Sequence, residues 1–76
     1  MPPLPVLTAT QLVRVLEKAG FLAVRQKGSH LRLRHEDGRV VTAPLHAGRD
    51  IGRGLLRKIL RDAELSPEEL AELLND

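Results

Sequence analysis

Cysteine is absent from this chain of 76 residues, and aromatic side chains are reduced to one, Phe21. Without thiols the protein has neither disulfides nor thiolate metal sites, so its fold depends on apolar packing and suits a reducing, cytoplasmic environment. Proteins that read single-stranded RNA by sequence commonly stack bases on exposed aromatic rings, which one phenylalanine cannot supply. Any recognition of nucleic acid is therefore expected to depend on backbone, shape and charge.

Long apolar runs are missing as well. No stretch approaches the roughly 18 apolar residues of a membrane span, and residues 1–7 lack the pattern of a secretion signal. We expect a soluble protein that makes no membrane contact. A chain this short forms one domain, residues 1–76, and buries only about 60% of the surface that its unfolded chain exposes. An exposed face that meets a polymer is thus the favoured type of site, and no small-molecule cofactor is expected.

Positive charge is concentrated in the first part of the chain. Residues 1–61 carry all 12 Lys and Arg against four acidic residues, a net charge of +8, whereas residues 62–76 carry six acidic residues and no basic one. A basic body favours a polyanionic partner, because neutralising phosphates releases counterions and supplies most of the non-specific affinity for nucleic acid. A merely solvated basic surface is the alternative.

Apolar periodicity and capping residues predict an α+β fold. A capping box at Thr8 begins the first helix, and Gly20 ends it. Asp37-Gly38 predicts a hairpin turn, Pro44 is expected to stop the third strand, and Ser66 begins a short acidic helix. The expected order is a helix from 8, strands at 21–27, 30–36 and 39–43, a second helix that ends at about 63, and a short helix from 66. The apolar stripe of the second helix includes Ile51, but Gly52 and Gly54 leave its beginning open. Two helices should cover one face of a three-stranded antiparallel sheet.

The second predicted strand carries the candidate chemistry. Side chains alternate along a strand, so Leu31 and Leu33 should point to the core while His30, Arg32 and Arg34 point to solvent. An imidazole, with a reference pKa of about 6.5, exchanges protons at cellular pH, and guanidinium groups bind phosphate in a forked geometry. Cleavage of a phosphodiester needs this combination. An ordinary solvated basic strand with an incidental histidine has the same pattern.

The other two histidines rank below His30. His35 is predicted on the core face at the strand end, where a structural or solvated role is favoured. His46 follows Pro44 in a loop, and we weigh its reaching the open face of the sheet equally with plain solvation. His30 and His35 lie on opposite strand faces, and the sequence has no His-x-x-x-His pair, so no metal site is predicted. Gly28-Ser29 either lets a ligand backbone approach His30 or simply closes a hairpin.

Several segments together resemble the HicA family of toxins. They are Leu4-Pro5-Val6-Leu7, Gly20-Phe21, Arg25-Gln26-Lys27-Gly28-Ser29-His30, Pro44-Leu45-His46 and Gly54-Leu55-Leu56-Arg57-Lys58-Ile59-Leu60. The resemblance implies a double-stranded-RNA-binding-domain-like fold, messenger RNA interferase activity in a type II toxin–antitoxin system, and neutralisation by a HicB-type antitoxin. It also implies that the histidine of Gly-Ser-His, His30, is catalytic. Where the family usually has Gly-Thr-Leu, this chain has Leu55 and so lacks a hydroxyl.

The combined prediction is a metal-independent endoribonuclease that acts on mRNA, single- or double-stranded. His30 serves as general acid or base, His46 or Lys58 assists, and the nucleophile is the 2′-hydroxyl of the RNA itself. The residues expected to bind RNA are Arg25, Lys27, Gly28, Ser29, Arg32 and Arg34. The alternative is a non-catalytic RNA-binding module of the same fold, which has no need of an imidazole on its open face.

Overall fold

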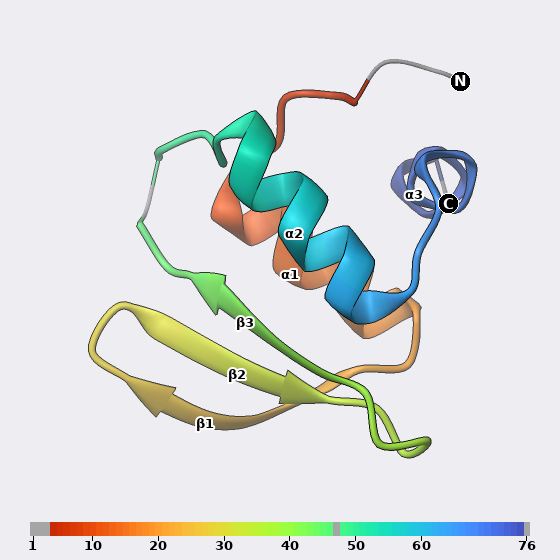
Figure 1. Ribbon diagram of the computed structural model, residues 1–76. Helices are drawn as coiled ribbons and strands as arrows, with labels where there is room; N and C mark the ends of the chain where they lie inside the picture. Colours follow the sequence, from red (N-terminus) through yellow and green to blue (C-terminus); the bar gives the residue numbers. More distant parts are fainter. Residues whose placement is uncertain (1–3, 47, 76) are drawn as a thin grey trace.

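The computed structural model describes residues 4–46 and 48–75. Its elements in chain order are α1 (Ala9–Lys18), β1 (Leu22–Lys27), β2 (His30–Arg34), β3 (Val40–Pro44), α2 (Arg53–Ala63) and α3 (Pro67–Leu74). The strands form an antiparallel sheet in the order β1-β2-β3. Helices α1 and α2 pack against β3 on the same side of the sheet, and α3 packs against α1 (Figure 1). The predicted α+β fold with a three-stranded antiparallel sheet is confirmed.

Helix α1 begins and ends where its capping residues predict. The Thr8 hydroxyl accepts a hydrogen bond from the Gln11 amide at 3.2 Å, and the Gln11 side chain accepts one from the Thr8 amide at 2.9 Å. At the other end Gly20 has φ +101°, and the Phe21 amide donates to the Leu16 carbonyl at 3.0 Å. This is a Schellman cap, which requires a left-handed residue at the position of Gly20. The turn places Phe21 in the core, where it is fully buried.

Helix α2 begins later than the apolar stripe suggests. Ile51 is buried but precedes the helix, whose N-cap is Gly52. The Ile51 amide donates to the Leu7 carbonyl at 2.6 Å, and Asp50 forms an isolated antiparallel bridge with Thr8. This extended pairing keeps Ile51 out of the helix, although its side chain still joins the core. Helix α3 has the predicted capping box at Ser66.

Two strand ends also differ from the prediction. Strand β2 ends at Arg34 because the chain turns there: the His35 amide donates to the Arg39 carbonyl at 2.9 Å. Strand β3 runs through Pro44, which pairs with His30 in the register. The backbone pairing continues one bond further, from the Leu45 amide to the Ser29 carbonyl at 2.6 Å. Proline is tolerated here because β3 is an edge strand.

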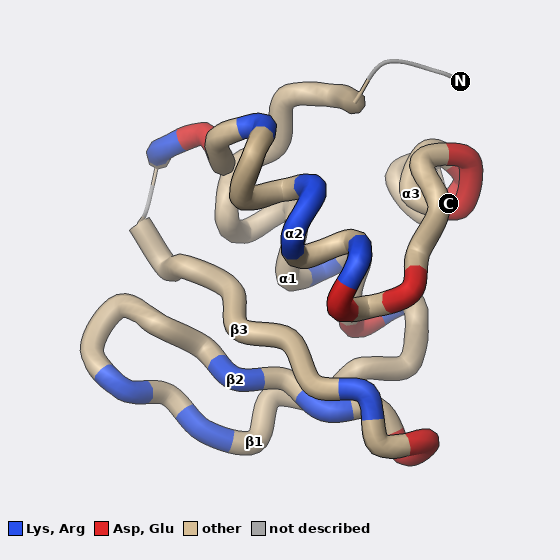
Figure 2. Tube along the Cα trace, in the orientation of Figure 1, with Lys and Arg blue, Asp and Glu red and all other residues tan. Residues whose placement is uncertain are grey.

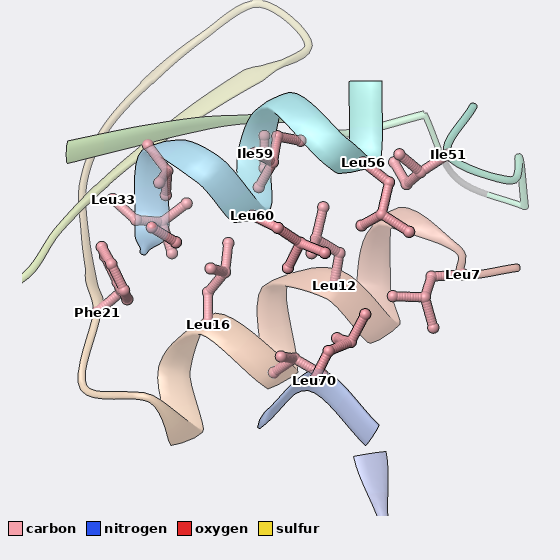
Figure 3. Packing of buried hydrophobic residues seen from close by; sticks show 14 of the residues in the cluster. Leu7, Leu12, Leu16, Phe21, Leu33, Ile51, Leu56, Ile59, Leu60 and Leu70 are labelled. Atoms are coloured by element: carbon pink, nitrogen blue, oxygen red, sulfur yellow. The ribbon is translucent and has the colours of Figure 1, made fainter. Parts of the chain in front are cut away.

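The core lies between the helices and one face of the sheet (Figure 3). Leu33 contributes to it from β2, Leu12 and Leu16 from α1, and Leu70 from α3, and each of these side chains is fully buried. Leu31, predicted to share the core face with Leu33, is only half-buried. None of the helices in residues 4–46 and 48–75 has the length and apolar character needed to cross a bilayer.

The hairpin between β2 and β3 is fastened to α2 by side chains that the sequence analysis did not single out. Arg39 lies over the Phe21 ring, 5.1 Å from its centroid, and donates a hydrogen bond to the Ala63 carbonyl at the end of α2. Its Nε lies 2.8 Å from Oδ2 of Asp37. Hydrogen bonds from the side chain and the backbone of Arg39 hold the pKa of Asp37 below its ordinary value of 3.8.

His35 has a structural position at the same end of the sheet. Its ring meets Phe21 edge to face, with 5.3 Å between the ring centroids. Its Nδ1 accepts a hydrogen bond from the Asp37 amide at 3.1 Å, and its side chain is 18% exposed. Of the two roles weighed for His35, structural and solvated, the packing supports the structural one.

Candidate nucleic-acid interface

The sheet has one face without a helix, and β2 turns its polar side chains to it. His30, Arg32 and Arg34 are exposed, while Leu33 between them is buried, as the alternation predicts. Directly opposite residues in a sheet share a face. Arg25 lies opposite Arg32, and Lys27 lies opposite His30. The open face is therefore formed by these five residues of β1 and β2, whose basic positions lie side by side in Figure 2.

A β-bulge in β1 brings Arg25 to the open face. Ala23 lies opposite Leu33, and Arg25 lies opposite Arg32, so Val24 has no partner in β2. Without the bulge, Ala23 and Arg25 would lie on the same face of the strand. Because of the extra residue, Ala23 lies on the same face of the sheet as Leu33, while Arg25 and Lys27 lie on the open face. Sequence alternation groups Arg25 with Lys27 but gives no sign of the bulge.

The open face contains a shallow hollow of about 200 Å³, which we call the cationic hollow. Its lining residues are Arg25, Lys27, His30, Arg32 and Thr42. Three cationic side chains and one imidazole thus line the same hollow. Guanidinium and ammonium groups bind phosphoryl oxygens by charge-assisted hydrogen bonds, and an imidazole can take or give a proton beside them. The hollow can thus hold a phosphate group next to a proton-transfer group.

A second hollow, of about 290 Å³, lies where the segment after β3 meets the beginnings of α1 and α2; we call it the loop hollow. Its polar lining comes from His30, His46, Arg49 and Asp50. Ala9, Pro44, Ile51 and Leu55 line the rest of it. His30 thus lines both hollows, and the structure brings His46 to one of them. The sequence analysis did not identify Arg49 or Asp50 as site residues.

The remaining predicted site residues have different positions. Arg34 is exposed on the open face, but it is not among the described residues that line either hollow. Lys58 lies on α2, with its Nζ 3.0 Å from Oδ2 of Asp62. It is not among the described residues that line either hollow. Its assisting role stays a prediction.

Gly28 and Ser29 form the turn that leads into His30. Gly28 has φ +58°, and a β-carbon built on it would meet no atom within 4 Å, so the space beside its backbone is open. The carbonyl of Ser29 is already used, because it accepts the Leu45 amide. The geometry therefore agrees with both interpretations of this turn, close approach of a ligand and simple hairpin closure.

No acidic residue is among the described residues that line the cationic hollow. Within residues 4–46 and 48–75, no group of three or more His, Cys, Asp or Glu side chains is placed to hold a metal ion. Acidic residues gather on α3, near the end of α2 and at the turn between β2 and β3 (Figure 2), and Asp50 lies in the segment before α2, at the loop hollow. The open face therefore keeps its positive charge.

Comparison with known families identifies a family whose model matches most of the chain. The model of a family described as the HicA toxin of bacterial toxin–antitoxin systems matches residues 9–65. The matched segment begins with the first residue of α1 and ends before α3, so it contains the whole sheet and both hollows. A search of curated proteins found none that matches the chain.

Proposed function

The chain belongs to the HicA toxin family, and from this premise we propose that it is an mRNA interferase, an endoribonuclease that cleaves messenger RNA. The observation that carries the proposal is the position of His30. Its exposed imidazole shares the cationic hollow with Arg25, Lys27 and Arg32. A phosphodiester held by these cations has a proton-transfer group beside it, which binding alone would not require.

In the proposed mechanism the nucleophile belongs to the substrate. His30 removes the proton from a ribose 2′-hydroxyl, whose oxygen attacks the adjacent phosphorus while the bond from phosphorus to the 5′-oxygen breaks. Arg25 and Arg32 stabilise the negative charge that grows on the phosphoryl oxygens. The departing 5′-oxygen takes a proton from His46, which lines the loop hollow together with His30. The products are a 2′,3′-cyclic phosphate and a 5′-hydroxyl.

The family also implies a cognate antitoxin, which we propose is a HicB-type protein that covers His30. The open face is the surface that RNA must reach, so a partner that covers it blocks cleavage without altering the fold. A complex in which His30 stays fully exposed would contradict this assignment.

The proposal is tested with labelled RNA, the wild-type protein and a His30→Ala variant in excess chelator. We expect the wild type to cleave, to leave a 2′,3′-cyclic phosphate, and to spare any site whose ribose is replaced by deoxyribose. His30→Ala should lose cleavage by roughly 100- to 10,000-fold, the usual effect of removing a general acid or base. Its circular dichroism and RNA binding should remain, because the side chain is exposed.

The other outcomes identify the rival mechanisms. RNA binding by the wild type without any cleavage would assign the chain to the non-catalytic RNA-binding modules. Full inhibition by the chelator would show that cleavage requires a metal ion, and efficient cutting at a deoxyribose position would show that the 2′-hydroxyl is not the nucleophile.

A further inference from the structure

The two hollows share His30 in their lining but differ in chemistry. The cationic hollow is lined by positive side chains, whereas the loop hollow has the carboxylate of Asp50 and a largely apolar wall. A nucleotide bound with its phosphate in the cationic hollow would have its neighbouring sugar and base at the loop hollow. The volume of about 290 Å³ lies near the lower end of small-ligand sites, roughly 300 to 1,000 Å³.

The loop hollow suits a flat base rather than a second phosphate. A carboxylate repels phosphate but accepts hydrogen bonds from N–H groups. Pro44, Ile51 and Leu55 offer apolar surface to the faces of a base. Phe21 is fully buried and cannot stack on RNA. The planar groups of His46 and Arg49 in the same hollow can do so instead.

The backbone of Asp50 is held in place, and its carboxylate has no partner within residues 4–46 and 48–75. The backbone bridge to Thr8, together with the bond from the Ile51 amide to the Leu7 carbonyl, fixes this segment against the start of α1. The residue is exposed, and in the described part of the chain no hydrogen bond or ion pair engages its carboxylate. A carboxylate on a predominantly basic surface that has no partner among the described residues is available to a ligand.

We propose that the loop hollow binds the nucleobase next to the scissile phosphate and that Asp50 selects guanine there. Guanine is the base whose Watson–Crick edge presents two adjacent donors, N1–H and the 2-amino group, to the two oxygens of one carboxylate. This inference rests on the proposed function, since it takes RNA as the ligand of the open face. It adds a specificity-determining residue that makes no contact with the reacting atoms.

The test measures binding and requires no cleavage. Guanosine 3′-monophosphate and inosine 3′-monophosphate, which lacks only the 2-amino group, are titrated into ¹⁵N-labelled protein, with inorganic phosphate as the baseline. We expect the guanine nucleotide to shift the amide signals of residues 49–51 and 55 beyond the phosphate baseline. The inosine nucleotide should bind about 10- to 100-fold more weakly, the range of one hydrogen bond to a charged group.

Two variants separate recognition from general effects of charge. Asp50→Ala should bind both nucleotides equally while keeping the phosphate-induced shifts on β1 and β2. Glu72→Ala removes the same charge from an exposed position on α3, which packs against α1, and should keep the preference for guanine.

The results that would contradict this inference differ from those that would contradict the proposed function. Equal binding of the two nucleotides by the wild type would overturn the inference, even if the protein cleaves RNA through His30. So would an Asp50→Ala variant that keeps the preference for guanine but melts at a lower temperature, since Asp50 would then be structural. A guanine preference that depends on Asp50, in a protein that never cleaves, would support the base site and reject the nuclease.

Discussion

The imidazole of His35 lies against Gly20 so closely that a β-carbon built on the glycine would come 2.8 Å from its Nε2 atom. The same ring packs on Phe21. Gly20, with φ +101°, also ends α1. The Gly20-Phe21 pair, which forms part of the resemblance to the toxin family, is therefore explained by packing and backbone conformation and not by chemistry on the open face.

Gly20→Ala should destabilise the protein more than Gly38→Ala does. Both glycines have φ +101°, but a β-carbon at Gly38 would meet nothing within 4 Å. The left-handed backbone alone costs about 1 to 2 kcal/mol for a residue with a side chain. Overpacking against His35 adds about 1 to 3 kcal/mol at Gly20. Urea unfolding of the two variants measures the difference, and equal losses would show that His35 moves aside freely.

Local signals predicted much of this fold because they act over a few residues. The capping boxes at Thr8 and Ser66 and the glycine cap of α1 were identified correctly, since each depends on residues within one helical turn. The sequence does not define the start of α2, because Gly52 and Gly54 lie at the beginning of its apolar stripe. Ile51 continues the apolar spacing of that helix, but its backbone pairs with Leu7, far away in the sequence.

The open face was predicted better than the surroundings of the site. Alternation along β2 grouped His30 with Arg32 and Arg34, and the register brings Arg25 and Lys27 beside them. The alternation overestimated the burial of Leu31, because the depth at which a side chain is buried depends on how far the helices cover the sheet and not on the strand alone. The residues that line the loop hollow come from distant parts of the chain, between α1 and α2. No local pattern in the sequence could therefore have indicated Asp50.

Replacing a cation of the open face should flatten the salt dependence of RNA binding. Each phosphate contact contributes about 0.7 to 0.9 to the slope of log K against log salt. Arg32→Ala should therefore reduce the slope by about one unit, as should Arg34→Ala. Arg57→Ala removes the same charge from an exposed position on α2, on the other side of the sheet, and should leave the slope unchanged. Fluorescence anisotropy over a salt series measures these slopes, and wild-type slopes for Arg32→Ala and Arg34→Ala would exclude a phosphate contact by either residue.

The rate of cleavage should show a bell-shaped dependence on pH that His46→Ala changes on one side only. A general base must be unprotonated, which gives the acid limb, and a general acid must be protonated, which gives the alkaline limb. With His46 as the acid, His46→Ala should lower the rate at neutral pH and abolish the alkaline limb. Single-turnover rates from pH 5 to 9 provide the profile. An unaltered alkaline limb would assign the proton donor to another group.

Asp37 should make stability depend on acid pH. Hydrogen bonds from Arg39 lower the pKa of Asp37 below the value of 3.8 that it has without such partners. The ionised carboxylate thus stabilises the fold at pH values above 3.8, and this contribution disappears as the pH falls through the lower, folded-state pKa. The advantage of the wild type over Asp37→Asn in the free energy of unfolding should be constant at neutral pH and shrink in acid.

Urea unfolding of the wild type and Asp37→Asn from pH 7 to 2 measures this advantage. Hydrogen bonds from Ser66 lower the pKa of Glu69 too. Because Glu69 is present in both the wild type and Asp37→Asn, its contribution cancels in the difference between their free energies of unfolding. An advantage that stays constant down to pH 2 would show that the ion pair with Arg39 contributes nothing.

Helix α3 lies beyond the segment that matches the toxin family, yet its Leu70 is fully buried in the core. Lys18 of α1 also donates to the Leu73 carbonyl at 3.0 Å. A ribosome makes a chain from its N-terminus, so every residue of the open face is synthesised before the residue that completes the core. A nascent chain that ends before Leu70 already contains His30 and its neighbouring cations, but on a domain with an unfilled core. The fully packed domain is thus reached only after its open face has been synthesised.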